Sequence, residues 1–157
     1  MNLSHVRAVV TGGVSGLGLA VAQRLVSDGA RVALFDINDE KGAAAVASLG
    51  ESNARYWRTD VTDEQQVVDH TAAAREFLGG LNAAINCAGI LGAGRVLGKD
   101  GAMPLKQFAG TVMVNLVGSF NVAKACAALM QDNAAGEDGE RGAIVNTASV
   151  AAYEGQI

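Results

Sequence analysis

The feature that most limits the possible folds is an alternation of short apolar strands and amphipathic helices. Residues 7–11 (Arg-Ala-Val-Val-Thr) are rich in β-branched side chains, and a glycine cluster follows them. Apolar residues then recur at helical spacing at Leu17, Val21 and Leu25. Residues 31–36 form a second run that is apolar on both faces, as the strands of buried parallel sheets are. The repeating unit is therefore predicted to be a strand, a tight turn and a helix.

The same unit recurs along the rest of the chain. The pattern predicts helices over residues 39–49, 62–78 and 104–132, and strands over residues 54–58, 83–86 and 143–147. Thr62 and Gln65 have the spacing of a capping box at the start of one helix. Strict alternation with short loops specifies an α/β fold with an open, doubly wound parallel sheet of the Rossmann class. Such sheets bind ligands at the carboxyl ends of their strands.

Composition excludes several classes of partner. A length of 157 residues predicts one domain, and a net charge of −4 disfavours nucleic acid. Residues 107–123 carry no charge, but the stretch is shorter than the ~20 apolar residues that span a bilayer, so we interpret it as a buried helix and expect no membrane partner. Cys87 and Cys126 are far apart and match no metal-ligand spacing, so no metal site is expected. With no signal peptide, the predicted location is cytoplasmic.

A glycine cluster lies between the first strand and the first helix. Residues 11–18 read Thr-Gly-Gly-Val-Ser-Gly-Leu-Gly. Glycines at such a junction let the backbone approach a pyrophosphate, which the positive end of the helix attracts. The alternative is an ordinary glycine-rich loop, but the flanking strand, helix and distal acid favour a dinucleotide site.

That acid is Asp36, which ends the second strand eighteen residues after Gly18. A carboxylate at this distance accepts hydrogen bonds from the adenosine ribose and repels a 2′-phosphate. Neither Ser15 nor Ile37 supplies a cation that could pair with such a phosphate. The expected cofactor is therefore NAD, not NADP, and the alternative is that Asp36 merely caps a helix.

Together these motifs resemble the short-chain dehydrogenase/reductase family. Besides the glycine cluster, the similar features are Asp60-Val61, Asn86-Cys-Ala-Gly89, Asn115 and Ser149, in the family's order. The resemblance implies catalytic roles for Asn115, which would order a water in the proton path, and Ser149, which would polarise the substrate oxygen. The cofactor-binding positions are Gly12, Ser15, Gly16, Leu17, Gly18, Asp36, Asp60, Val61, Asn86, Cys87, Ala88 and Gly89.

Within the family, the chain is most similar to the short-chain 3-hydroxyacyl-CoA dehydrogenases, also called type-10 hydroxysteroid dehydrogenases. Cys87, the acidic loop before Arg141-Gly142 and the stretch from Asn146 to Gln156 carry this similarity. It implies an NAD-dependent oxidoreductase that interconverts a 3-hydroxyacyl-CoA and the corresponding ketone, and a homotetramer when complete. A 3-oxoacyl-carrier-protein reductase is the alternative, although Asp36 favours NAD.

The family's catalytic pair is a tyrosine beyond the serine and a lysine four residues after it. Here Tyr153 is followed four residues later by Ile157, which cannot lower the pKa of a phenol as a lysine would, so Tyr153 is not expected to be the general acid or base. We therefore expect residues 1–157 to be the N-terminal, five-stranded portion of a single NAD-binding domain, incomplete at the C-terminus. A non-catalytic NAD-binding fragment is the alternative. His5 and His70 are expected to be solvated or capping residues.

Overall fold

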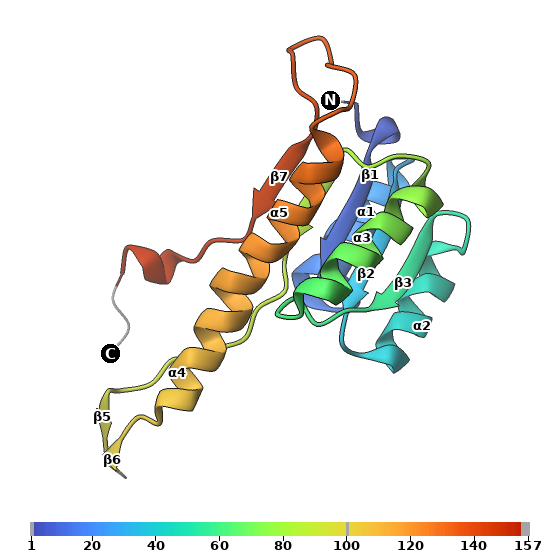
Figure 1. Ribbon diagram of the computed structural model, residues 1–157. Coiled ribbons are helices and arrows are strands. Elements are labelled where there is room, and N and C mark those ends of the chain that lie inside the picture. The colour runs from blue at the N-terminus through green and yellow to red at the C-terminus, as the bar shows by residue number, and fades with distance from the viewer. Residues whose placement is uncertain (1, 100, 155–157) are drawn as a thin grey trace.

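The computed structural model describes residues 2–99 and 101–154. Its main sheet has five parallel strands in the order β3-β2-β1-β4-β7 (Figure 1). The strands are β1 (Arg7–Thr11), β2 (Arg31–Asp36), β3 (Ala54–Arg58), β4 (Ala83–Asn86) and β7 (Ala143–Asn146). The helices are α1 (Gly16–Ser27), α2 (Asp39–Leu49), α3 (Glu64–Leu78), α4 (Leu105–Val112) and α5 (Ser119–Met130). The predicted α/β class with a doubly wound parallel sheet is confirmed.

Side-chain alternation along the central strands builds a core on each face of the sheet. Val9 and Phe35 pack with α3 and α5 on one face, whereas Val10 and Leu34 pack with α1 and α2 on the other. All four side chains are fully buried. Both faces of β1 and β2 are therefore covered, which explains why these strands are almost continuously apolar.

The residue that caps one helix differs from the prediction. The residue that caps α3 is Asp63, whose carboxylate accepts a hydrogen bond from the backbone N–H of Gln66 at 3.0 Å. Thr62 instead donates its hydroxyl and its backbone N–H to Asp60 Oδ1. The predicted pair of Thr62 and Gln65 is wrong by one residue, because Asp60 engages Thr62 in a turn ahead of the helix.

The long helix predicted from residue 104 is confirmed, but its predicted burial is wrong for the first half. α4 and α5 are joined by a π-helical turn, Met113–Gly118, which the apolar pattern does not indicate. Figure 1 shows α4 running past the end of the sheet toward a hairpin of β5 (Leu97–Gly98) and β6 (Gly101–Ala102). Beyond the sheet, Phe108 and Leu116 are 59% and 66% exposed.

One helical stretch among the described residues, Leu105–Met130, has the length and apolar composition that could cross a membrane. These two properties also belong to core helices of soluble proteins. Val122, Cys126 and Met130 are buried in the core cluster beneath the sheet. This packing identifies the second half of the stretch as a core helix.

Candidate dinucleotide-binding site

A cleft of about 460 Å³ lies at the carboxyl ends of β1, β2 and β4, at the start of α1. Eleven of the twelve predicted cofactor-binding residues line it; the exception is Asn86. Phe35, Ile37, Thr59, Ile90 and Val114 also line the cleft and were not predicted from the sequence. The volume is within the range of small-molecule sites.

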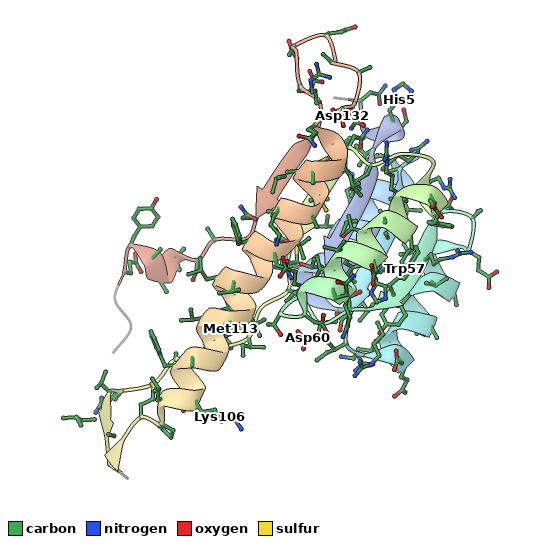
Figure 2. All side chains as sticks on the ribbon, in the orientation of Figure 1. His5, Trp57, Asp60, Lys106, Met113 and Asp132 are labelled. Carbon is green, nitrogen blue, oxygen red and sulfur yellow. The ribbon has the colours of Figure 1, made fainter. Side chains whose placement is uncertain are left out.

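A larger cavity of about 860 Å³ lies at the opposite end of the sheet, around His5, Arg7 and Arg141. Figure 2 shows this separation, with His5 at one end of the strands and Asp60 at the other. The larger cavity contains none of the predicted site residues. Because parallel sheets bind ligands at the carboxyl ends of their strands, the smaller cleft is the candidate site.

Three glycines shape the turn between β1 and α1, each for a different reason. A Cβ on Gly12 would lie 2.9 Å from Ala88 N and from Cys87 O, so Gly12 allows this turn to pass against the turn after β4. A Cβ on Gly18 would lie 2.3 Å from the Gly12 carbonyl oxygen. Gly16 has a φ of +51° with open space around its Cβ position. Only Gly16 therefore has the open space beside the backbone that a ligand needs.

The start of α1 offers hydrogen-bond donors to the cleft. Ser15 is the N-cap residue, but its side chain makes no capping hydrogen bond. The first-turn amides of a helix have no partner within the helix, and the helix dipole adds positive potential at that end. Ser15, Gly16, Leu17 and Gly18 all line the cleft, so this wall fits the pyrophosphate of a dinucleotide.

Asp36 lies at the adjoining wall of the cleft. Its Oδ1 accepts hydrogen bonds from the backbone N–H groups of Ile37 and Asn38 at 2.8 and 3.1 Å. Its Oδ2 accepts no hydrogen bond from any residue within 2–99 or 101–154, which suits it to accept from ribose hydroxyls. Asn38 caps α2, with Oδ1 accepting from Lys41 N at 2.9 Å. The alternative that Asp36 is a helix cap is therefore wrong.

Tyr56 forms a hydrogen bond with the backbone of Asp36. Its hydroxyl lies 3.0 Å from the backbone oxygen of Asp36 and 3.0 Å from Asp39 Oδ1. Burial, followed by the hydrogen bond to Asp39 and nearby negative charge, raises the pKa of Tyr56 to about 12. The phenol thus stays protonated near neutral pH and remains a donor.

The wall after β4 is held by Thr11, which ends β1. Thr11 Oγ1 accepts hydrogen bonds from the backbone N–H groups of Cys87 and Ala88 at 3.1 and 3.0 Å. Asn86, the predicted residue outside the cleft, is buried and donates to Ser119 O and to Asn146 Oδ1 at 3.2 and 2.9 Å. In this structure Asn86 joins β4 to α5 and β7.

The two predicted catalytic residues are not among the cleft-lining residues. Asn115, in the π-helical turn, holds the backbone of Ile90: its Oδ1 accepts from Ile90 N at 2.9 Å and its Nδ2 donates to Ile90 O at 3.0 Å. Ser149 is exposed, and its Oγ accepts from the backbone N–H of Ala151 at 3.2 Å. Tyr153 is 95% exposed, and Ile157 and Gln156 lie outside the described residues.

Sequence reasoning also missed the roles of Thr11, Gln66 and His70, which hold the walls of the cleft without lining it. Thr11 stands directly before the glycine cluster, which is the only sequence signal for its role. Gln66 and His70 hold the backbone or side chains of the cleft wall from α3. Among residues 2–99 and 101–154, the structure gathers no cluster of three or more His, Cys, Asp or Glu side chains that could hold a metal ion.

Residues 6–157 match the family model described as short chain dehydrogenase. The chain is 45% identical over 152 residues to 3-hydroxyacyl-CoA dehydrogenase type-2 of Bos taurus, covering 96% of this chain and 58% of that protein. It is 41% identical over 154 residues to 2,5-dichloro-2,5-cyclohexadiene-1,4-diol dehydrogenase of Sphingobium indicum, covering 98% of this chain and 58% of that protein.

The fold agrees with that of a solved structure, a 3-hydroxyacyl-CoA dehydrogenase type-2 from Mycobacterium avium. The TM-score is 0.87 at 39% sequence identity, covering 96% of this chain and 59% of that one. The chain thus spans little more than half the length of the relatives it matches.

Proposed function

The chain belongs to the short-chain dehydrogenase family, and we propose that the protein carrying it uses NAD to interconvert a secondary alcohol and a ketone, with a 3-hydroxyacyl-CoA as the alcohol. The observation that carries the proposal is the cleft in which the start of α1 and the carboxylate of Asp36 form adjoining walls. The relatives from Bos taurus and Mycobacterium avium are 3-hydroxyacyl-CoA dehydrogenases, which supports the acyl-CoA substrate.

The described residues divide the binding of NAD between them. The first-turn amides of α1 would hold the pyrophosphate, Asp36 would bind the ribose hydroxyls, and Asp60 and Val61 would line the adenine. The bound cofactor supplies the hydride chemistry. Cys87, Ala88 and Gly89 would form the wall toward the nicotinamide end, because they follow β4 on the side of the cleft away from β2.

We propose that Ser149 and Asn115 act beside the reacting atoms. Because Ser149 Oγ accepts from Ala151 N, its own O–H proton is available to a substrate oxygen. Asn115 uses both ends of its amide on Ile90, so its first contribution is to fix the segment that follows Gly89. A water in the proton path would bind to the remaining lone pair of Asn115 Oδ1.

The cofactor is tested by calorimetric titration with NAD and with NADP. We expect NAD to bind at least tenfold more tightly, a difference of about 1.4 kcal/mol, and Asp36→Asn to remove most of that preference. Glu40→Gln is the matched control, because it removes one exposed negative charge nearby and does not line the cleft. Equal or tighter binding of NADP by the unmodified chain would overturn the choice of NAD.

The substrate is tested on the complete protein with 3-hydroxyacyl-CoA esters of several chain lengths. The relative from Sphingobium indicum favours a second candidate, a cyclic diol, so such a diol belongs in the same panel. Activity with acyl-carrier-protein esters and NADPH would instead identify a 3-oxoacyl-carrier-protein reductase. Binding of NAD without turnover of any alcohol would identify a non-catalytic NAD-binding protein.

We also propose that the complete protein is a homotetramer located in the cytoplasm. The exposed apolar side chains of Phe108, Leu116 and Phe120 lie on one long helix and suit an interface, which supports a homotetramer. Two free cysteines, with Cys126 buried, support a reducing compartment such as the cytoplasm. Size measurement of the complete protein in solution tests the assembly directly.

A further inference from the structure

We infer that Gln66 and His70 on α3 are positioning residues that keep one wall of the cleft, Thr59–Val61, in the shape that binds adenosine. We name these three residues the adenosine wall; all of them line the cleft beside Phe35 and Asp36. The inference rests on the proposed dinucleotide function and adds two residues that do not themselves line the cleft.

The adenosine wall is linked to the residue expected to bind ribose. The backbone N–H of Thr59 donates to the backbone oxygen of Asp36 at 2.9 Å. Thr59 is 1% exposed and Val61 is 7% exposed, so both are fixed in the protein interior. A shift of this wall would therefore change the distance between the surfaces that would contact adenine and ribose.

Gln66 holds the middle of the wall with both ends of its side-chain amide. Its Oε1 accepts from the backbone N–H of Asp60 at 3.1 Å, and its Nε2 donates to Asp63 Oδ2 at 2.7 Å. Asp63 is itself fixed, because its Oδ1 accepts from Gln66 N at 3.0 Å. A side chain held at both ends loses little further freedom and acts as a rigid brace between the helix start and the Asp60 backbone.

His70 holds the first residue of the wall. Thr59 Oγ1 has one proton, which it donates to Trp57 O at 3.1 Å. The 3.0 Å contact between Thr59 Oγ1 and His70 Nδ1 then requires that His70 carry its proton on Nδ1 and donate it. The His70 ring also packs edge-on against Phe35, with centroids 6.2 Å apart. His70 is therefore partly buried and bonded, and its predicted role as a solvated or capping residue is wrong.

The third wall residue is held from a different helix. Val61 O accepts from Asn121 Nδ2 at 3.0 Å, and a Cβ on Gly118 would lie 2.5 Å from Val61 Cγ2. Loss of Gln66 or His70 would therefore loosen Asp60 or Thr59 while Val61 stays fixed by α5. The expected result is weaker binding of adenosine with the fold retained.

The test is calorimetric titration of the complete protein with NAD and with ADP-ribose, which carries adenosine and pyrophosphate but no nicotinamide. We expect Gln66→Leu and His70→Leu each to weaken both ligands about five- to tenfold, the effect of one lost hydrogen bond. His70→Asn should restore most of the affinity, because its amide N–H can still donate to Thr59 Oγ1. A merely structural role would not distinguish the Asn variant from the Leu variant.

Gln65→Leu is the matched control. Gln65 is the neighbour of Gln66 on α3, and its amide donates to Asp69 Oδ1 at 2.9 Å on the surface. Thermal melting of every variant confirms the fold, and Gln66→Met, which removes both hydrogen bonds but keeps an unbranched side chain of similar length, replaces Gln66→Leu if that variant does not melt cooperatively.

The outcomes separate the two proposals. If the unmodified complete protein binds neither NAD nor ADP-ribose, the proposed function fails and the inference falls with it. If the unmodified protein binds both, while the Gln66 and His70 variants bind as tightly as Gln65→Leu, only the inference is overturned. Equal weakening by His70→Asn and His70→Leu would likewise overturn the role of the His70 hydrogen bond.

Discussion

The first strands of the chain and its longest helix contain apolar residues at similar density but bury them to very different extents. In β2, Phe35 is fully buried between α3 and the sheet. In α4, the first part of the long helix, Phe108 is 59% exposed. The difference comes from position, because β2 lies inside the sheet whereas α4 runs past its end (Figure 1). Apolar spacing therefore indicates a helix without indicating what covers it.

The largest difference in stability is expected between the alanine variants of Phe35 and Phe108. Phe35→Ala should lower the free energy of unfolding by about 3–5 kcal/mol, because it opens a cavity in a closed core. Phe108→Ala should change the same quantity by less than about 0.5 kcal/mol, as exposed sites do. Urea unfolding measures both. A similar loss at the two sites would show that Phe108 is packed as closely as Phe35.

Two glycines provide the next test, with the same substitution in each region. Gly18→Ala places a methyl group 2.3 Å from the Gly12 carbonyl oxygen, so we expect a loss of about 1–3 kcal/mol from forced backbone movement. Gly110→Ala meets nothing within 4 Å in α4 and should raise stability by up to about 1 kcal/mol, because alanine favours helix. Thermal melting compares them, and stabilisation by Gly18→Ala would contradict the packing described for the turn.

A smaller effect is expected from the pH dependence of stability, through Cys126 in the buried half of the long helix. Burial raises the pKa of the Cys126 thiol from 9.0 to about 12. Above pH 9 the unfolded chain loses this proton while the folded chain retains it, so stability is complete below pH 9 and falls as pH rises toward 12. The slope is about 1.4 kcal/mol per pH unit.

Urea unfolding between pH 8.5 and 9.5 measures this slope before most of the tyrosine side chains ionise, since the ordinary pKa of tyrosine is about 10. Cys126→Ala is the comparison, because it removes the thiol and should remove the additional slope. An unchanged slope in that variant would show that Cys126 does not cause the fall.

The smallest change in stability is expected at the exposed helix face. Replacing Leu116 and Phe120 together by Lys should leave the melting temperature nearly unchanged, because both side chains are 66% exposed. The same pair should reduce self-association, which exposed apolar patches promote. Sedimentation at several concentrations measures association, and Val122→Lys, at a fully buried position, should unfold the chain. Undiminished association of the Leu116 and Phe120 variant would exclude this face as the contact.

Much of the fold followed from local patterns. The apolar runs at β1 and β2 and glycines after α1 and α2 are short-range signals, and they predicted these elements to within a residue or two. Bonds made across the fold were not predictable in this way. Asp63 displaced Thr62 as the cap of α3 because Asp60 engages Thr62, and the π-helical turn has no periodic signal.

The residues of the candidate site also fall into those predictable from local spacing and those that depend on contacts across the fold. Asp36 and the glycine cluster were found because their spacing along the chain reflects the turn they form. Gln66 and His70 were missed because their partners, Asp60 and Thr59, are identified only once α3 is packed against β3. Gly12 lines the cleft and also has a packing role that its place in the glycine cluster does not indicate, since its closest constraint is the backbone of Ala88, 76 positions later.

The parallel pairing of β4 with β7 has a consequence for the order in which the molecule is made. Asn86 and Asn146, joined by a hydrogen bond, are 60 positions apart, whereas β1 and β2 pair across a single short helix. At about 5–20 residues per second, a ribosome needs about 3–12 seconds to make that intervening stretch. During this interval β4 is the unpaired edge of the sheet. The helix over residues 105–130 leaves the ribosome before β7 has been made. Because an unpaired strand edge can pair with other chains, this interval is when the nascent chain is most exposed to aggregation.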